Sequence, residues 1–344
     1  MMSVEMNNPI AVAALTGGQK TASARFRFRQ YIDRLKNYSV QVQEHIPYWG
    51  VSCGLPSPFK MISRIPGLLR SRRADVVWIN KELVQGYMTF EKLLKRPRIL
   101  DVDDAIWKNR PFGRMAQPAI ARAMDAVIAG NEYLASYYRQ YCPQVFVVPT
   151  AIDLDRYPLR PADQEPKDRF IIGWTGQRAN YPHLFMLEGV LGRFLEKHSE
   201  ARVRILSNSP WRPERINPDR VENIQWTPDN EISELYKMHV GIMPLKDDEW
   251  ARGKCSFKML QYMAAGLPVI ASPVGMNQEV LAAGEIGFSA VEEEQWIEAL
   301  EALYGDSSLR SRLGAEGRRV VEQHYNADQV ARQLAEIFHA LAQQ

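Results

Sequence analysis

A regular alternation of short apolar runs with longer helix-like stretches is the sequence feature that most limits the fold. The first half contains PIAVAALT, DVVWIN, RILDVDD, AVIAGN and VFVVPT, and the second half repeats the pattern with FIIGWTGQ, VRILSN, IQWTP, VGIMPL and PVIASP. Such runs are typical of buried strands, and strands that alternate with helices form parallel sheets. The sequence therefore predicts an α/β protein with two doubly wound, Rossmann-like domains.

The predicted domain boundaries follow changes in composition. Residues 1–158 are expected to form the first domain, and the Pro-rich and charged residues 159–169 form a linker. The second domain covers residues 170–326. Residues 327–344 are predicted as a helix with an apolar face that carries Val330, Leu334, Phe338 and Leu341. In doubly wound domains ligands bind at the carboxyl ends of the strands.

The segment GKCSFKMLQYMAAGLPVIASPVG, from Gly253, carries the strongest functional signal. Ser256 is a good N-cap, so a short helix is expected from about Phe257. Lys258 then lies in the first turn and Lys254 just before it, where the helix dipole favours anionic groups over cations. Lysines beside the N–H groups of a helix start indicate a phosphate site. A solvated helix end with two surface lysines is the alternative.

This segment resembles the donor-binding segment of the family 4 (group 1) glycosyltransferases, which have the GT-B fold. Family members carry a glutamate, seven residues and a second glutamate that leads into A-x-A-x-G-x-P-V-[IV]-A. In Q-Y-M-A-A-G-L-P-V-I-A the second glutamate is Gln261, and the first falls at Gly253. The resemblance implies two domains that face each other across a cleft, with helix 327–344 crossing back to the first domain.

Most site predictions depend on this resemblance. Lys254 and Lys258 are expected to act on the departing diphosphate. The remaining donor-binding candidates are Gly17, Gly18, Arg178, Gly253, Cys255, Ser256, Phe257 and Gln261. Cys255 has no histidine nearby in the sequence, so a packing role is its alternative. Trp226 ends a predicted strand, and its flat ring suits a nucleobase, although a core tryptophan is an equal alternative.

The run LDVDD contains Asp101, Asp103 and Asp104. A D-x-D pattern suits magnesium or manganese, but that interpretation belongs to a different glycosyltransferase fold. Asp103 aligns roughly with the histidine of the family's T-V-H-D element, which implies a catalytic role as acceptor of the hydroxyl proton. A helix-capping or structural aspartate is the alternative. We expect no metal and no cofactor.

Charge is unevenly distributed along the chain. Residues 1–170 hold 25 Lys and Arg against 16 Asp and Glu, a net charge of +9, and the remainder carries −6. A basic half suggests an anionic partner, either a lipid-linked phosphate or an anionic membrane. Nucleic acid is not expected, because no helix-turn-helix or zinc-finger spacing is present. The basic residues gather in two stretches, ARFRFR and FKMISRIPGLLRSRR. In the first, Arg25 and Arg27 are acceptor-side candidates, and the second is expected to be a helix broken at Pro66 and Gly67. Arginines on solvated helix faces, without a partner role, are the alternative.

Composition predicts a cytoplasmic protein that could bind peripherally to the inner leaflet of the membrane. No apolar run approaches the roughly 18 residues of a membrane span. Cys53, Cys142 and Cys255 are widely spaced without a CxxC pair, which favours a reducing compartment and no structural zinc. His45 is the single histidine of residues 1–158 and fits no motif.

Together these features predict a retaining glycosyltransferase that moves a sugar from a nucleoside diphosphate donor to a hydroxyl group. The expected acceptor is a saccharide or a lipid-linked saccharide, in cell-surface polysaccharide or glycoconjugate biosynthesis. Two other functions stay open. One is a nucleotide-binding scaffold that lost activity with the two glutamates, and the other is a GT-B sugar-nucleotide epimerase.

Overall fold

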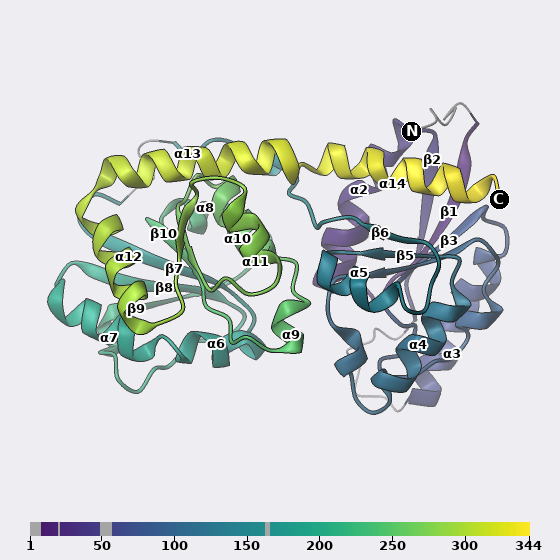
Figure 1. Ribbon diagram of the computed structural model, residues 1–344, viewed down its shortest axis with the longest axis horizontal. Coiled ribbons are helices and arrows are strands. Elements are labelled where there is room, and N and C mark those ends of the chain that lie inside the picture. Colours follow the sequence, from purple (N-terminus) through teal and green to yellow (C-terminus); the bar gives the residue numbers. More distant parts are fainter. Residues whose placement is uncertain (1–7, 20, 49–56, 162–165) are drawn as a thin grey trace. The chain divides into compact units, whose positions relative to one another are not determined.

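The computed structural model describes residues 8–19, 21–48, 57–161 and 166–344 (Figure 1). The chain forms two compact units. Unit 1 comprises the described residues up to Ala151, together with Arg252–Cys255 and Ala327–Gln344. Unit 2 comprises the described parts of Ile152–Ala251 and Ser256–Asn326. These units differ from the predicted domains at residues 152–158 and 252–255, and the described part of the predicted linker 159–169 belongs to unit 2.

Unit 1 contains a six-stranded parallel sheet with the order β2-β1-β3-β4-β5-β6. Its strands are β1 (Ile10–Leu15), β2 (Val40–His45), β3 (Val76–Asn80), β4 (Arg98–Val102), β5 (Ala126–Ala129) and β6 (Val145–Val147). Val12 of β1 lies opposite Val42 of β2 and Val76 of β3. The strand order reverses between β1 and β3, and a crevice for ligands is expected outside their carboxyl ends.

The helices of unit 1 cover both faces of this sheet. They are α1 (Ala22–Ala24), η1 (Arg25–Arg29), α2 (Gln30–Lys36), α3 (Ser57–Ser71), η2 (Glu91–Leu93), η3 (Ile106–Lys108), α4 (Gly113–Ala123), α5 (Glu132–Tyr138) and α14 (Ala327–Ala342). α14, drawn in yellow in Figure 1, buries its apolar face against the sheet. Its Phe338 lies 5.1 Å from the ring of Trp78, which stacks on Phe28 at 3.7 Å. The apolar stripe predicted from the sequence therefore packs in the core of unit 1.

Unit 2 contains a second six-stranded parallel sheet, with the order β12-β11-β10-β7-β8-β9. Its strands are β7 (Phe170–Gly176), β8 (Ala201–Ser207), β9 (Val221–Gln225), β10 (Val240–Met243), β11 (Val269–Ala271) and β12 (Gly287–Ser289). The order reverses between β7 and β10, so the expected ligand crevice lies at the carboxyl ends of these two strands.

Unit 2 also surrounds its sheet with helices. They are η4 (Leu154–Arg156), η5 (Arg178–Asn180), α6 (Tyr181–Phe185), α7 (Glu188–Lys197), η6 (Pro218–Arg220), α8 (Glu231–Tyr236), α9 (Glu249–Arg252), α10 (Phe257–Ala264), α11 (Met276–Ala282), α12 (Glu293–Gly305) and α13 (Ser307–His324). Even-numbered β7 residues, such as Ile172 and Trp174, share a core with α7 and α12. Successive side chains of a strand alternate between faces.

The predicted α/β architecture is confirmed, and every strand predicted from an apolar run is present. Two strands were missed, β2 and β12. Both lie at a sheet edge, where polar residues such as those of VQVQEH are tolerated and the apolar signal weakens. The predicted break at Pro66 and Gly67 was wrong, because α3 runs through both residues. Within the described residues, no helix combines the length and apolar character that a membrane span requires.

Candidate functional site

Lys258 lies at the point of unit 2 where the strand order reverses. It is in the first turn of α10, as predicted, and its Nζ lies 4.8 Å from the centroid of the Trp174 ring. Gly176, the last residue of β7, has no room for a side chain. A Cβ there would lie 2.6 Å from Trp174 Cη2 and 2.8 Å from Lys258 Cε. The side chain of Lys258 therefore packs against the end of β7, at the carboxyl edge of the sheet.

The start of α10 departs from the expected N-cap. Ser256 precedes the helix, but its side chain makes no cap, and its φ of +50° lies in the left-handed region. Its hydroxyl donates to Oδ1 of Asn277, 2.7 Å away, and Asn277 Nδ2 donates to the Ser272 carbonyl. A non-glycine residue in this region costs about 1–3 kcal/mol, and such residues cluster at functional sites. The structure thus holds the turn before α10 in a strained form.

Besides Ser256 and Gln261, three donor-site candidates belong to unit 2. Phe257 opens α10 and is half-buried. Arg178 is exposed just after β7, and its backbone N–H donates to Asn208 Oδ1 at 3.0 Å. Trp226 follows β9, away from the reversal of strand order, and its indole N–H donates to Glu231 at 3.1 Å.

Gln261 is different, because it is buried within unit 2. Its Nε2 donates to the hydroxyl of Tyr157 at 2.9 Å, and only 4% of the residue is exposed. A buried amide needs such a partner. The structure therefore corrects the prediction that Gln261 binds the donor: this side chain holds α10 to the chain after η4.

The short segment Arg252–Cys255, just before this helix, packs in unit 1. Asn131 Nδ2 donates to the carbonyl of Lys254 at 3.0 Å. A Cβ on Gly253 would lie 2.7 Å from the backbone nitrogen of Ala105. No glutamate fits at this position without a backbone shift. Gly253 is therefore a close-packing residue, and its donor contact stays a prediction.

Cys255 is also a packing residue. Its thiol donates to the backbone carbonyl of Asp103, 3.3 Å away. Burial is the main cause that raises the pKa of this thiol well above its usual value. The prediction that Cys255 binds the donor is corrected, because the side chain is buried in unit 1. Lys254 and Lys258 also belong to different units, which sequence proximity alone concealed.

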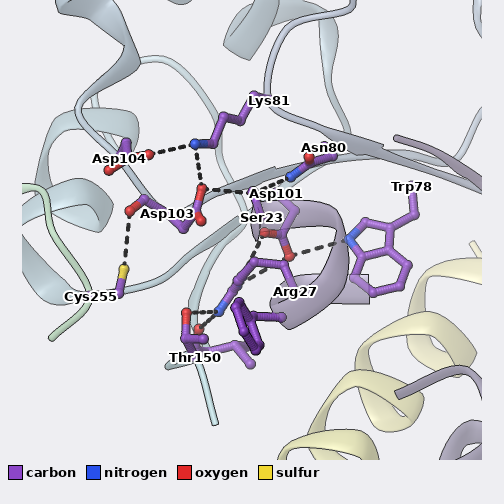
Figure 2. Close-up of polar contacts among 12 residues, drawn as sticks. Ser23, Arg27, Trp78, Asn80, Lys81, Asp101, Asp103, Asp104, Thr150 and Cys255 are labelled. Atoms are coloured by element: carbon purple, nitrogen blue, oxygen red, sulfur yellow. Dashed lines mark hydrogen bonds and ion pairs between the residues drawn. The ribbon is translucent and has the colours of Figure 1, made fainter. Parts of the chain in front are cut away.

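A network of ion pairs lies just after the carboxyl ends of strands β3 and β4 in unit 1 (Figure 2). Lys81, directly after β3, has its Nζ 2.8 Å from Asp103 Oδ1 and 2.5 Å from Asp104 Oδ2. Ser23 donates to Asp103 at 3.0 Å and accepts from Asn80 at 2.8 Å. Lys81 has a φ of +59°, so it too is a strained residue.

Asp103 is therefore held as an anion. Burial alone would raise the pKa of its carboxyl group, but Lys81, with help from Arg27 and Ser23, lowers this pKa below its usual value. A carboxylate with a lowered pKa is a weaker base. The geometry thus supports the structural alternative for Asp103 better than the predicted transfer of a proton.

Arg27 makes a second, fully buried ion pair in the same network. Its Nε lies 2.8 Å from Asp101 Oδ1, its Nη2 3.1 Å from Asp101 Oδ2, and its Nη1 donates to the Val148 carbonyl at 2.7 Å. Only 1% of Arg27 is exposed. The prediction that Arg27 contacts the acceptor was wrong. Arg25 is half-buried, with its guanidinium over the ring of Phe26 at 4.6 Å.

The predicted glycine loop of unit 1 makes hydrogen bonds to other residues of unit 1. Gly17 and Gly18 follow β1 and are buried. The Gly18 carbonyl accepts from Arg29 Nη2 at 2.8 Å and from Thr21 Oγ1 at 2.9 Å. The φ of Gly18 is +136°, which a residue with a Cβ rarely adopts. This loop lies where the strand order of the first sheet reverses, so Gly17 and Gly18 stay predictions for a ligand contact.

Sequence reasoning missed Ser23, Asn80 and Lys81. Asn80 and Lys81 follow a predicted strand directly, and polar residues at that position are the signal that identifies them. No group of three or more His, Cys, Asp or Glu side chains suited to a metal ion occurs in the described part of the chain. Cys53 lies outside the described residues.

Comparison with known proteins identifies the larger part of unit 2. Residues 169–306 match the sequence profile of the family described as Glycosyl transferases group 1. This segment belongs to the group 1 glycosyltransferase family. The transferase domain includes Arg178, Lys258 and the strands from β7 to β12. The chain is also 31% identical over 126 residues to spore coat protein SA of Bacillus subtilis. The aligned region covers 36% of this chain and 33% of that relative.

Solved structures share the fold of the whole chain. Sucrose-phosphate synthase from Thermosynechococcus elongatus matches with a TM-score of 0.75 at 15% identity, over 96% of this chain and 99% of that one. Anabaena HepE, in complex with UDP and glucose, matches with a TM-score of 0.70 at 12% identity, over 96% and 100%. At these identities the likeness concerns the fold alone. The chain has the GT-B fold, as predicted.

Proposed function

We propose that the protein transfers a sugar from a nucleoside diphosphate donor to a hydroxyl group. The observation that carries this proposal is the position of Lys258 beside Gly176 at the carboxyl edge of the transferase domain's sheet. The departing diphosphate gains negative charge as the sugar leaves, and a fixed ammonium group stabilises that charge. HepE, which shares the fold, has been solved with UDP-glucose, and this supports a nucleotide-sugar donor.

The donor phosphates would lie at the start of α10. Lys258 and the first N–H groups of the helix supply positive charge there. Arg178, exposed after β7, adds a second cation for the diphosphate. Because these groups neutralise the leaving group, we propose a reaction without a metal ion. By resemblance to the family, the anomeric configuration is retained.

The acceptor side is assigned to unit 1. We propose a saccharide or lipid-linked saccharide acceptor, used in cell-surface polysaccharide or glycoconjugate biosynthesis at the inner leaflet. Helix α3 supports this setting, because Phe59, Ile62 and Leu69 are between 48% and 56% exposed on its surface. Exposed arginines follow at Arg70 and Arg72. Apolar side chains beside basic ones are typical of helices that bind an anionic membrane surface.

A two-step screen tests the transfer reaction. Nucleoside diphosphates are ranked by the shift that they cause in the unfolding temperature, and the best one then selects the labelled sugar nucleotides for transfer assays. We expect one donor to bind and to release its sugar to an acceptor or, slowly, to water, with retention measured by NMR of the product. Binding without any release would support the scaffold. A donor converted to its epimer without acceptor would identify the epimerase.

Sedimentation with vesicles tests the membrane proposal. We expect the protein to bind vesicles that contain anionic lipid at low salt and to dissociate at high salt, because each basic residue at such a surface contributes about 1 kcal/mol. A variant with Arg70, Arg72 and Arg73 changed to Gln should bind clearly less. Equal and negligible binding of both proteins at low salt would favour a soluble acceptor.

A further inference from the structure

A cavity of about 250 Å³ lies within unit 1, beneath the first half of α3. It is bounded by α3, by the loop that follows β3 and by the residues before α4. Three of its lining residues are cations, Lys60, Arg64 and Arg110, and none of the described lining residues is acidic. Three cations therefore gather around this cavity, and they form part of the basic excess of the first half of the chain.

Arg64 is built into the wall of this cavity. Only 5% of the residue is exposed, and its Nε donates to the Leu83 carbonyl at 2.9 Å while Nη1 donates to the Thr16 carbonyl at 2.5 Å. Burial, partly offset by Glu91, lowers the pKa of Arg64 to about 10, so the guanidinium is still charged at neutral pH. These bonds fix a positive charge beside the ends of β1 and β3.

His45 gives an independent sign of a ligand. It ends β2, it is 94% buried, and its Nε2 has no hydrogen-bond partner among the residues that the structure describes. Together with Arg64 it lines a small hollow that shares Pro47, Ser63 and Leu83 with the cavity. A buried polar atom without a partner costs free energy, so such an atom beside a cavity points to a missing partner.

The loop that closes the cavity is held by two buried carboxylates. Glu82 accepts from the Gly86 N–H at 3.0 Å, from Asn109 at 2.7 Å and from Gln117 at 2.9 Å. Glu91 accepts from the Leu83 N–H at 3.0 Å. The wall is therefore formed before any ligand arrives, which lowers the entropy lost on binding.

We propose that this cavity binds a phosphate group of the acceptor. Lys60, Arg64 and Arg110 supply the charge-assisted contacts. The proposal rests on the proposed transfer function, because it names the class of acceptor: a phosphorylated one. The phosphate belongs either to a soluble sugar phosphate or to a lipid headgroup that reaches the cavity beneath the apolar and basic face of α3.

Calorimetric titration with inorganic phosphate tests the site directly. The full chain is first saturated with the nucleoside diphosphate found in the screen, so that phosphate does not report on the donor site. We expect Lys60→Gln and Arg110→Gln each to weaken phosphate binding about tenfold, because each removes one charge-assisted contact. Lys60→Arg should keep most of the affinity, and Lys92→Gln, at an exposed lysine outside the cavity, should keep all of it.

Vesicles distinguish the two sources of phosphate. Binding to vesicles that contain phosphatidic acid, lost in Arg110→Gln and stronger than binding to phosphatidylglycerol of equal charge, would support a lipid headgroup. Phosphate binding without this preference would support a soluble phosphate. Wild-type affinity for phosphate in both Gln variants, with unfolding temperatures unchanged, would overturn the proposal. If the transfer function itself is wrong, no donor releases its labelled sugar in the transfer screen, whatever the phosphate affinity of the variants is.

Discussion

The carboxyl edges of the two sheets hold their basic residues in different ways. In unit 1, Arg27 is paired with Asp101, and Lys81 lies between two aspartates. In unit 2, the ammonium group of Lys258 lies over the ring of Trp174. A carboxylate neutralises the cation in the pairs of unit 1, and an aromatic face attracts the cation in unit 2. Two units of similar fold thus use basic residues for stability in one case and, we propose, for an anionic ligand in the other.

The largest expected effect comes from the buried pair of unit 1. Arg27→Met leaves the carboxylate of Asp101 buried without its ion partner, which should lower the free energy of unfolding by about 3–5 kcal/mol. Chemical denaturation measures this loss. The double variant with Asp101→Leu removes both charges and should recover a large part of it. A loss below about 1 kcal/mol in the single variant would contradict a stabilising role for the pair.

Lys258→Ala provides the opposite case in unit 2. We expect the affinity for a nucleoside diphosphate to fall by about 1.5–3 kcal/mol, because one charge-assisted contact is lost, with little change in the free energy of unfolding. Calorimetry and chemical denaturation give the two values. Lys237→Ala, at an exposed lysine of the same unit, is the matched control. Unchanged diphosphate affinity would remove Lys258 from the donor site.

Gly176→Ala tests whether the lysine depends on the strand beneath it. The new methyl group would press on Trp174 and on Lys258 Cε, which should cost about 1–3 kcal/mol of stability. Because Lys258 must move, diphosphate affinity should fall as well. Gly305→Ala, where the added Cβ meets nothing within 4 Å, is the control in helix α12. Normal diphosphate affinity in Gly176→Ala would show that diphosphate binding by Lys258 does not depend on its packing against Gly176.

A smaller effect concerns pH and the pair of Lys81 with Asp103. The pKa of Asp103 is lowered in the folded protein, so this carboxylate stabilises the fold above its unfolded pKa, and the contribution is lost as the pH falls through the folded value. Lys81→Met removes the main group that lowers the pKa. The stability difference between wild type and variant should therefore shrink between pH 6 and pH 3. A constant difference would contradict the ion pair.

The smallest expected effect is that of a chelator. If Lys258, Arg178 and the start of α10 neutralise the diphosphate, EDTA should leave most of the transfer activity intact. The assay is labelled-sugar transfer with and without EDTA. Activity lost with EDTA and restored by manganese would instead give Asp101, Asp103 and Asp104 a metal-binding role. The charged residues of unit 1 would then serve the donor as well as the stability of the fold.

The site was predicted less completely than the fold. The position of Lys258 in the first turn of a helix followed from Gly266, Pro268 and the apolar spacing, which are local signals. The burial of Gln261 did not, because its partner Tyr157 lies 104 residues away. The same holds for Arg27, whose partner Asp101 is 74 residues distant. A basic residue in a basic stretch gives no sign of whether a distant carboxylate will bury it.

The sequence by itself determined the alternation of strands and helices, because the burial of apolar side chains follows the period of each element. It also placed a lysine at the start of α10. Only the tertiary structure decided which basic residues are neutralised and which segment belongs to which unit. Gly253 and Cys255 stand beside the donor helix in sequence, yet they pack on Ala105 and Asp103 of unit 1. Ion pairing and close packing depend on distances between residues far apart in the chain, and no local pattern records those distances.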